Sequence, residues 1–227
     1  MDDDRWKYLK IHIELIYPRW LLISDAITIY KKYFHNGDRR GIFEAIVKEF
    51  KITKAIYPGS YIHVAPSFYI PEVVYVDSFK KTKNFFDDEK FYEIINKNKK
   101  YDEETIVRFH LVDFYKEVEE KLESFDLLIS QYAGFVSQYC KKYLKPGGLL
   151  VANNSHGDAS MASLDRSFEF IAVIYYSNKT YRFTTRSLDQ YFIPKKKNFK
   201  VTKEHLEKSM KGIGYTKTAS AYLFKKI

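Results

Sequence analysis

Between residues 54 and 154 the chain alternates apolar runs with helical patterns, and this alternation limits the folds that it can adopt. The run at 72–78, EVVYVDS, is apolar on both faces, as expected for a strand buried within a parallel sheet. Alternating β and α units predict a doubly wound, mostly parallel sheet with helices on both faces. The predicted strands lie at 54–57, 72–78, 105–114, 125–131 and 149–154, and the predicted helices between them at 88–98, 115–123 and 134–144.

The N-terminal residues follow a helical pattern instead. Residues 5–50 carry apolar side chains at mixed spacings of three and four, which is the periodicity of helices. Pro18 is expected to break or kink the first helix, and Asn36-Gly37 marks a turn before a second helix at 39–50. We therefore predict an N-terminal helical extension, residues 1–50, packed on the sheet.

The C-terminal part departs from the alternation of strands and helices. Thr202 is expected to cap a helix that continues to Met210. No repeat or flexible linker interrupts the chain, so residues 51–227 are predicted to form one domain, and the whole chain a single unit with decorations. An antiparallel hairpin is predicted from residues 168–176 and 179–187, and two final strands from residues 214–219 and 221–227.

Charge and cysteine content restrict the cellular compartment and the binding partners that we expect. The 227 residues include one cysteine, Cys140, which rules out an intramolecular disulfide and suits a reducing compartment. No signal peptide and no apolar run long enough to span a bilayer is recognisable, so we expect a cytoplasmic protein without a membrane partner. The formal net charge of +9 permits binding to nucleic acid, although a solvated lysine-rich surface explains it equally well.

Polar residues follow each of the five predicted strands of the parallel sheet. In a doubly wound sheet, ligands bind at the carboxyl ends of the strands, so these residues are expected to meet at one edge. A polar loop residue alone means little, but the joint pattern indicates a binding site. The residues are Pro58, Gly59, Ser60, Tyr61 and His63 after the first strand, then Asp77 and Ser78, Asp113 and Phe114, Ser130, Gln131 and Tyr132, and finally Asn153, Asn154, Ser155, His156 and Asp158.

Several of these features resemble the class I S-adenosylmethionine-dependent methyltransferases, which have a Rossmann-like fold. In that family an acid ends the second strand and binds the ribose hydroxyls, and a polar residue after the third strand meets the adenine. A Phe-Asp pair commonly opens the fourth strand, and an LKPGG turn precedes the fifth. The corresponding residues here are Asp77, Asp113, Phe125-Asp126 and the run YLKPGGLLV at 143–151, so that the resemblance covers roughly residues 50–155.

The resemblance implies S-adenosylmethionine as the cofactor. An ionised acid accepts strong hydrogen bonds from two hydroxyls, and a glycine lets the backbone approach a ligand closely. Gly59 precedes Asp77 by 18 residues, near the spacing of about 20 for a glycine loop and a ribose-binding acid. The implied cofactor-binding residues are Pro58, Gly59, Ser60, Asp77, Asp113, Phe114 and Ser130.

The glycine loop departs from the family pattern. Gly59 is its only glycine, and Pro66 follows closely, so the helix after the first strand must be shortened or shifted. Tyr61 and His63 are expected either to line the cofactor space or to fill it. The sparse loop also argues against NAD, whose pyrophosphate depends more on such a loop and on a helix N-terminus.

His156 is the candidate general base, because the pKa of a histidine lies near neutrality. Asp158, two residues later, is predicted to orient it, and the competing interpretation is an ordinary polar loop. His63, His156, Asp77 and Asp158 show no metal-ligand spacing, so no metal site is predicted.

Two functions remain open from the sequence. The first is an S-adenosylmethionine-dependent methyltransferase-like enzyme with an unknown methyl acceptor. The second is a non-catalytic Rossmann-like binding or regulatory protein that contacts nucleic acid or an acidic partner. The sparse glycine loop favours the second, whereas Asp77 and Asp113 favour the first.

Overall fold

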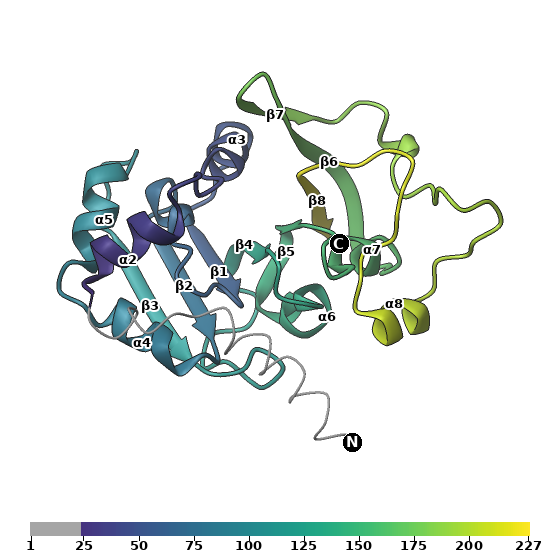
Figure 1. Cartoon of the computed structure of the whole chain (residues 1–227). Helices are drawn as coiled ribbons and strands as arrows, with labels where there is room; N and C mark the ends of the chain where they lie inside the picture. The colour runs from purple at the N-terminus through teal and green to yellow at the C-terminus, as the bar shows by residue number, and fades with distance from the viewer. Residues whose placement is uncertain (1–23) are drawn as a thin grey trace.

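The computed structural model describes residues 24–227, which form a single eight-stranded sheet flanked by helices (Figure 1). The strand order is β3-β2-β1-β4-β5-β8-β6-β7, with β3 to β5 parallel and β8 antiparallel to both of its neighbours. This order confirms the predicted doubly wound, mostly parallel sheet. The strands are β1 (Lys54–Pro58), β2 (Glu72–Asp77), β3 (Ile106–Leu111), β4 (Phe125–Ser130), β5 (Leu144–Ala152), β6 (Phe168–Ser177), β7 (Thr180–Thr184) and β8 (Ala221–Lys226).

Helices cover both faces of the sheet. The α-helices are α2 (Ala26–Tyr33), α3 (Gly41–Glu49), α4 (Lys80–Phe86), α5 (Phe91–Asn98), α6 (Val136–Cys140), α7 (Asp158–Ser163) and α8 (Lys203–Ser209). Short 3₁₀ turns are η2 (Ala65–Phe68), η3 (Lys141–Tyr143) and η4 (Leu188–Gln190). Of the predicted N-terminal extension, the structure shows α2 and α3, whereas residues 5–23 with the expected break at Pro18 lie outside the described part.

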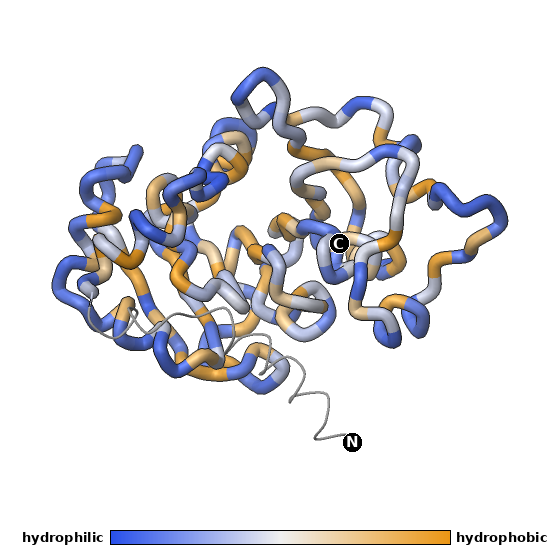
Figure 2. Tube along the Cα trace, viewed as in Figure 1, coloured by the Kyte–Doolittle hydropathy of each residue, from blue (hydrophilic) through white to orange (hydrophobic). Residues whose placement is uncertain are grey.

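The core divides into two layers because successive residues of a strand point to opposite faces. On β1, Ala55 and Tyr57 pack with α2, α3 and α5, whereas Ile56 packs with α6 and α7 on the other side. Figure 2 shows the hydrophobic segments concentrated on the sheet and on the inner sides of the helices, and hydrophilic segments on the outer loops. Strands buried on both faces explain the apolar runs found in the sequence.

Local sequence signals set the C-terminal elements. Asn178 and Lys179 both have positive φ and form the tight turn between β6 and β7, which confirms the predicted hairpin. The side chain of Thr202 accepts a hydrogen bond from the backbone N–H of His205, so Thr202 caps α8 as predicted. The lysine run Lys195–Lys197 lies exposed in the loop before α8.

Two predicted elements are absent from the described residues. Residues 115–123 are not helical, because Val118 is buried and both its N–H and its carbonyl bond the hydroxyl of Tyr143, at 2.7 and 3.0 Å. These two bonds hold the segment in an irregular path beside β4. Residues 214–219 form no strand beyond one bridge between Tyr215 and Pro194, and the Tyr215 hydroxyl donates to Ser160 of α7.

Among the described residues, no helix is long and apolar enough to cross a membrane. The same residues include no group of three or more His, Cys, Asp or Glu side chains that could hold a metal ion.

Candidate functional site

The strand order reverses between β1 and β4, which lie side by side in the sheet. In doubly wound sheets this switch point opens a crevice at the carboxyl ends of the strands. The loops after β1, β3 and β4 converge there. A Cβ built on Gly59 would lie 2.2 Å from the Cβ of Ala133 and 3.7 Å from the ring of Phe114.

Gly59 is required by this convergence. Its φ of +65° lies in the left-handed region, and Ala133 leaves no room for a side chain. The N–H groups of Gly59 and Ser60 both donate to the carbonyl of Val76, at 2.7 and 3.3 Å, which folds the loop onto β2. The sequence predicts a glycine here for close approach to a ligand. In the structure, the open space beside Gly59 admits the loop after β4.

Asp77 ends β2 and faces the loop after β1. Its Oδ2 accepts the backbone N–H of Tyr61 at 2.7 Å, and its Oδ1 accepts that of Phe79 at 2.8 Å. Burial raises the pKa of Asp77 and the charge of Asp113 adds to the rise, whereas the two N–H bonds oppose it. Each carboxylate oxygen has two lone pairs, so both oxygens retain acceptor capacity for hydroxyl groups of a ligand.

The other residues predicted to bind the cofactor differ in accessibility. Asp113 is half-buried, and its Oδ1 accepts the N–H of Tyr115 at 3.0 Å. Phe114 is buried and stacks on Tyr115 with the ring centroids 4.5 Å apart. Pro58, Ser60 and Ser130 are buried.

His63 is part of the core. Its Nε2 donates to the carbonyl of Asp38 at 2.5 Å, and its Nδ1 accepts the Tyr57 hydroxyl at 3.0 Å. We assign this tautomer because a carbonyl can only accept. Burial lowers the pKa of His63 to about 4, so the ring is neutral at pH 7. Tyr61, in the same loop, is half-buried, and its ring lies 5.0 Å from that of Tyr33.

Asp158 does not orient His156. The Asp158 side chain is buried, and it accepts hydrogen bonds from the hydroxyls of Ser130 and Ser137, both at 2.5 Å, and from the N–H of Ser137. Burial raises the pKa of Asp158 to about 6. The carboxylate therefore joins β4, α6 and α7, and the predicted pairing with His156 is wrong. Gly157, with φ of +91°, turns the chain between the two residues.

His156 is instead oriented by Ser155. The Ser155 hydroxyl donates to Asn153 Oδ1 at 2.9 Å, and it lies 3.0 Å from Nδ1 of His156. Since the hydroxyl has one hydrogen, Nδ1–H of His156 must donate to Ser155, which leaves Nε2 free to accept a proton. Burial lowers the pKa of His156, so the imidazole is neutral at pH 7.

Gln131, directly after β4, carries an amide donor without a hydrogen-bond partner among the described residues. The side chain is 4% exposed, and its Oε1 accepts from Asn153 Nδ2 at 3.4 Å. Its Nε2 has no hydrogen-bond partner among the described residues. A buried donor without a partner is costly, so an acceptor atom of a bound molecule would stabilise this position. The sequence places Gln131 after β4 but gives no sign of the unpaired amide.

Arg39 contacts Tyr132, in the loop after β4, and also lines a groove. The Arg39 guanidinium lies 4.3 Å from the ring centroid of Tyr132, which is 54% exposed. Arg39 also lines a groove of about 1110 Å³ between α3 and the β6–β7 hairpin. Arg39 therefore links the groove to the loop that follows β4.

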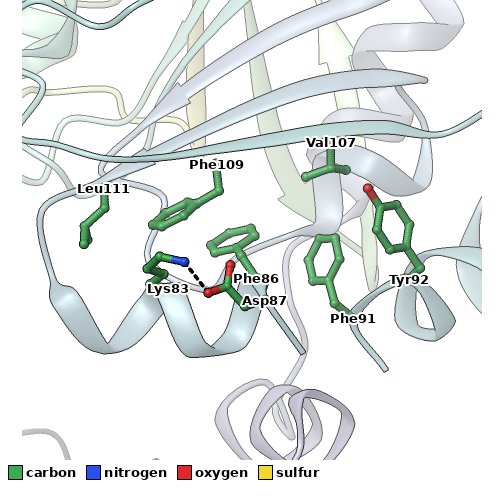
Figure 3. Close-up of a pocket in the computed structure, with 8 residues that line it drawn as sticks. All are labelled: Lys83, Phe86, Asp87, Phe91, Tyr92, Val107, Phe109 and Leu111. Atoms are coloured by element: carbon green, nitrogen blue, oxygen red, sulfur yellow. Dashed lines mark hydrogen bonds and ion pairs between the residues drawn. The ribbon is translucent and has the colours of Figure 1, made fainter. Parts of the chain in front are cut away.

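A smaller pocket of about 290 Å³ lies at the opposite edge of the sheet, against β3 (Figure 3). Figure 3 shows the rings of Phe86 and Phe109 face to face, with their centroids 4.3 Å apart, beside the ion pair of Lys83 and Asp87. The pocket is lined by α4, α5 and β3 and none of the loops at the switch point reaches it. Its one carboxylate, that of Asp87, is paired with Lys83, so we do not assign the chemistry to this pocket.

The residues at the switch point fit an S-adenosyl group. Asp77 supplies charged acceptors for a ribose diol, and the orphaned Nε2 of Gln131 supplies a donor. The loop after β1 offers no phosphate cradle, since only a four-residue 3₁₀ turn follows it. A nucleoside cofactor without phosphate does not need one.

Comparisons with known proteins give similarity of structure but not of sequence. No protein-family model and no curated protein matches the chain. The similar solved structures include a candidate S-adenosyl-L-methionine-dependent methyltransferase from Methanococcus maripaludis, 17% identical with a TM-score of 0.41, over 60% of this chain and 65% of that one. They also include the O-methyltransferase TomG from Streptomyces achromogenes in complex with S-adenosylmethionine, 9% identical with a TM-score of 0.47, over 81% of this chain and 96% of that one.

A third similar structure is the O-methyltransferase from Bacillus cereus in complex with S-adenosylhomocysteine, 15% identical with a TM-score of 0.44, over 64% of this chain and 77% of that one. At such identities the similarity concerns the fold alone. The strand order of this chain, which reverses between β1 and β4, is that of a doubly wound, Rossmann-like sheet, and an acid ends its β2.

Proposed function

We propose that the protein transfers a methyl group from S-adenosylmethionine to an acceptor. The observation that carries this proposal is the position of Asp77. It ends β2, and its carboxylate is anchored by the loop after β1 while its oxygens retain free lone pairs. The cofactor would supply an electrophilic methyl group on a sulfonium.

The chain's residues would divide the binding between them. Asp77 would accept the two ribose hydroxyls, and Phe114 and Gly59 would form the wall of the crevice between the loops. Asp113 stands beside this wall with lone pairs for a polar edge of the adenine. An N–H on Nε2 of Gln131 would donate to an oxygen of the bound molecule, so that this nitrogen gains the partner that it lacks.

His156 would act as the general base. The hydrogen-bond chain from Asn153 through Ser155 holds the Nδ1–H tautomer, so Nε2 is the atom that takes the proton from a hydroxyl or amine of the acceptor. Its lowered pKa keeps Nε2 unprotonated at neutral pH. Asp158 would serve as a positioning residue, because its bonds to Ser130 and Ser137 tie α7, which follows the His156 loop, to β4 and α6.

Binding of the cofactor can be tested by calorimetry with S-adenosylmethionine and S-adenosylhomocysteine. We expect micromolar affinity for the wild type, and at least ten-fold weaker binding for Asp77→Asn, which keeps the volume but removes the charge; ten-fold corresponds to about 1.4 kcal/mol. Asp189→Asn is the matched control, because the same change is made at an exposed residue of η4. Thermal unfolding of each variant would confirm that it is folded.

Absence of binding by the wild type at millimolar ligand would contradict the proposal, as would equal weakening in the Asp189→Asn control. The first outcome would favour the non-catalytic alternative, a Rossmann-like protein that binds nucleic acid or an acidic partner. We further propose that the protein works in the cytoplasm, because its one cysteine, Cys140, is a buried free thiol.

A further inference from the structure

The groove between α3 and the β6–β7 hairpin combines aromatic rings with cations. In Figure 1, α3 and β7 stand next to each other at the top of the view, away from α4 and α8. Four tyrosines line the groove: Tyr69, Tyr175, Tyr176 and Tyr181. Tyr176 is 58% exposed and its ring lies 5.0 Å from that of Tyr181, so flat apolar faces are presented to a ligand.

The hairpin is fixed against α3 by Tyr181 and Phe183 of β7. A Cβ built on Gly41, the first residue of α3, would lie 2.5 Å from Cδ2 of Tyr181. Phe183 of β7 packs edge-on against Phe50 at the other end of α3, with the ring centroids 5.8 Å apart. An aromatic surface held at both ends loses little conformational entropy when a ring stacks on it.

The groove also has a positive charge excess. Arg40 is paired with the buried carboxylate of Asp38 at 2.8 Å, and Lys48 with Glu44 at 2.7 Å. Arg39, Lys179 and Arg182 line the same groove, and the described residues give none of the three an ion-pair partner. Glu49 is the single acid of the lining that likewise has no ion pair within residues 24–227.

These free cations are spread along the groove rather than gathered at one point. Arg39 precedes α3, Lys179 forms the hairpin turn and Arg182 lies within β7. A helix of nine residues is about 13 Å long, and a five-residue strand about 16 Å. A ligand with one anionic group would leave most of these cations unpaired, whereas a chain of phosphates spaced along the groove would meet them in turn.

We propose that this groove binds a single-stranded nucleic acid, whose bases stack on the tyrosines and whose phosphates pair with Arg39, Lys179 and Arg182. Stacking platforms combined with a basic track are the usual means of holding single strands. Because Arg39 lies against Tyr132, which follows β4, a strand in the groove would run toward the switch point. That the strand is also the methyl acceptor rests on the proposed function.

Binding can be measured by fluorescence anisotropy with a labelled oligothymidylate of about 12 nucleotides, without any cofactor, over a range of salt concentrations. We expect log K to fall with log salt at a slope near −2, since each of three phosphate contacts contributes about −0.7. Tyr176→Ala should weaken binding about ten-fold. The double variant Lys179→Ala with Arg182→Ala should reduce the magnitude of the slope by about 1.4.

Tyr92→Ala and Lys80→Ala are the matched controls, because both residues are exposed and lie on α5 and α4, away from the groove (Figure 1). Unchanged affinity in the groove variants would overturn the proposal, and so would equal losses in the controls. Full competition by a mononucleotide at equal concentration would also overturn it, in favour of a site for a small anion. Because no cofactor is present, this result is independent of the calorimetry that tests the methyltransferase proposal.

Discussion

Asp77 and Asp158 both lie at the carboxyl edge of the sheet, and burial raises the pKa of both, but their surroundings differ. Within residues 24–227, Asp77 accepts two backbone N–H groups, and it is partly exposed. Asp158 is fully enclosed by the hydroxyls of Ser130 and Ser137. A carboxylate with free lone pairs toward solvent can serve a ligand, whereas one whose partners are all internal holds elements together.

The largest effect is expected from Gly59→Ala, which disturbs the loop whose Tyr61 bonds Asp77. The new Cβ would meet Ala133 at 2.2 Å, and φ of +65° is unfavourable for alanine. Overpacking and backbone strain together should lower the free energy of unfolding by about 3 kcal/mol, measured by urea denaturation. The matched double variant with Ala133→Gly should recover part of the loss. No recovery would show that Ala133 is not the cause.

Asp158 should make stability fall as pH rises. Its pKa in the folded state is about 6, against 3.8 when unfolded, so the folded protein holds more protons between these values. The Asp158 carboxyl contributes up to about 3 kcal/mol to the free energy of unfolding below pH 4, and this contribution is lost as the pH rises past 6. Urea denaturation at several pH values should show the wild type losing stability relative to Asp158→Asn over this range. A constant difference would contradict the raised pKa.

His63 should have the opposite effect. Burial lowers the pKa of His63 to about 4 from 6.5. The neutral ring therefore contributes to the free energy of unfolding above pH 6.5, and this contribution is lost as the pH falls toward 4. Relative to His63→Gln, the wild type should therefore lose up to about 3 kcal/mol of stability on acidification. The same denaturation series tests this prediction, with His205→Gln on α8 as an exposed control. A loss on raising the pH would show that the imidazole is charged in the fold.

Sequence reasoning predicted the sheet better than the site. The apolar runs located β1, β2, β4 and β5 because burial on both faces is encoded within each of these strands. The irregular path at 115–123 depends on a hydroxyl 25 residues away, that of Tyr143, and no local pattern reports such a contact. The direction of Asp158 depends on the turn at Gly157, whose φ of +91° separates neighbours in sequence. The unpaired amide of Gln131 likewise becomes visible only when its surroundings are known.

The smallest effect separates two serines, Ser137, which bonds Asp158, and Ser155, which bonds His156. Ser137 is buried and donates to Asp158, so Ser137→Ala would leave a buried carboxylate with fewer donors and should cost about 2 kcal/mol of unfolding free energy. Ser155 is exposed, so Ser155→Ala should change stability by less than about 0.5 kcal/mol. Ser155→Ala should instead change the NMR titration of His156, because it removes the acceptor of Nδ1–H and with it the preference for one tautomer. Equal stability losses in the two variants would mean that the Ser155–His156 bond is structural, and would remove the argument that His156 is held ready as a base.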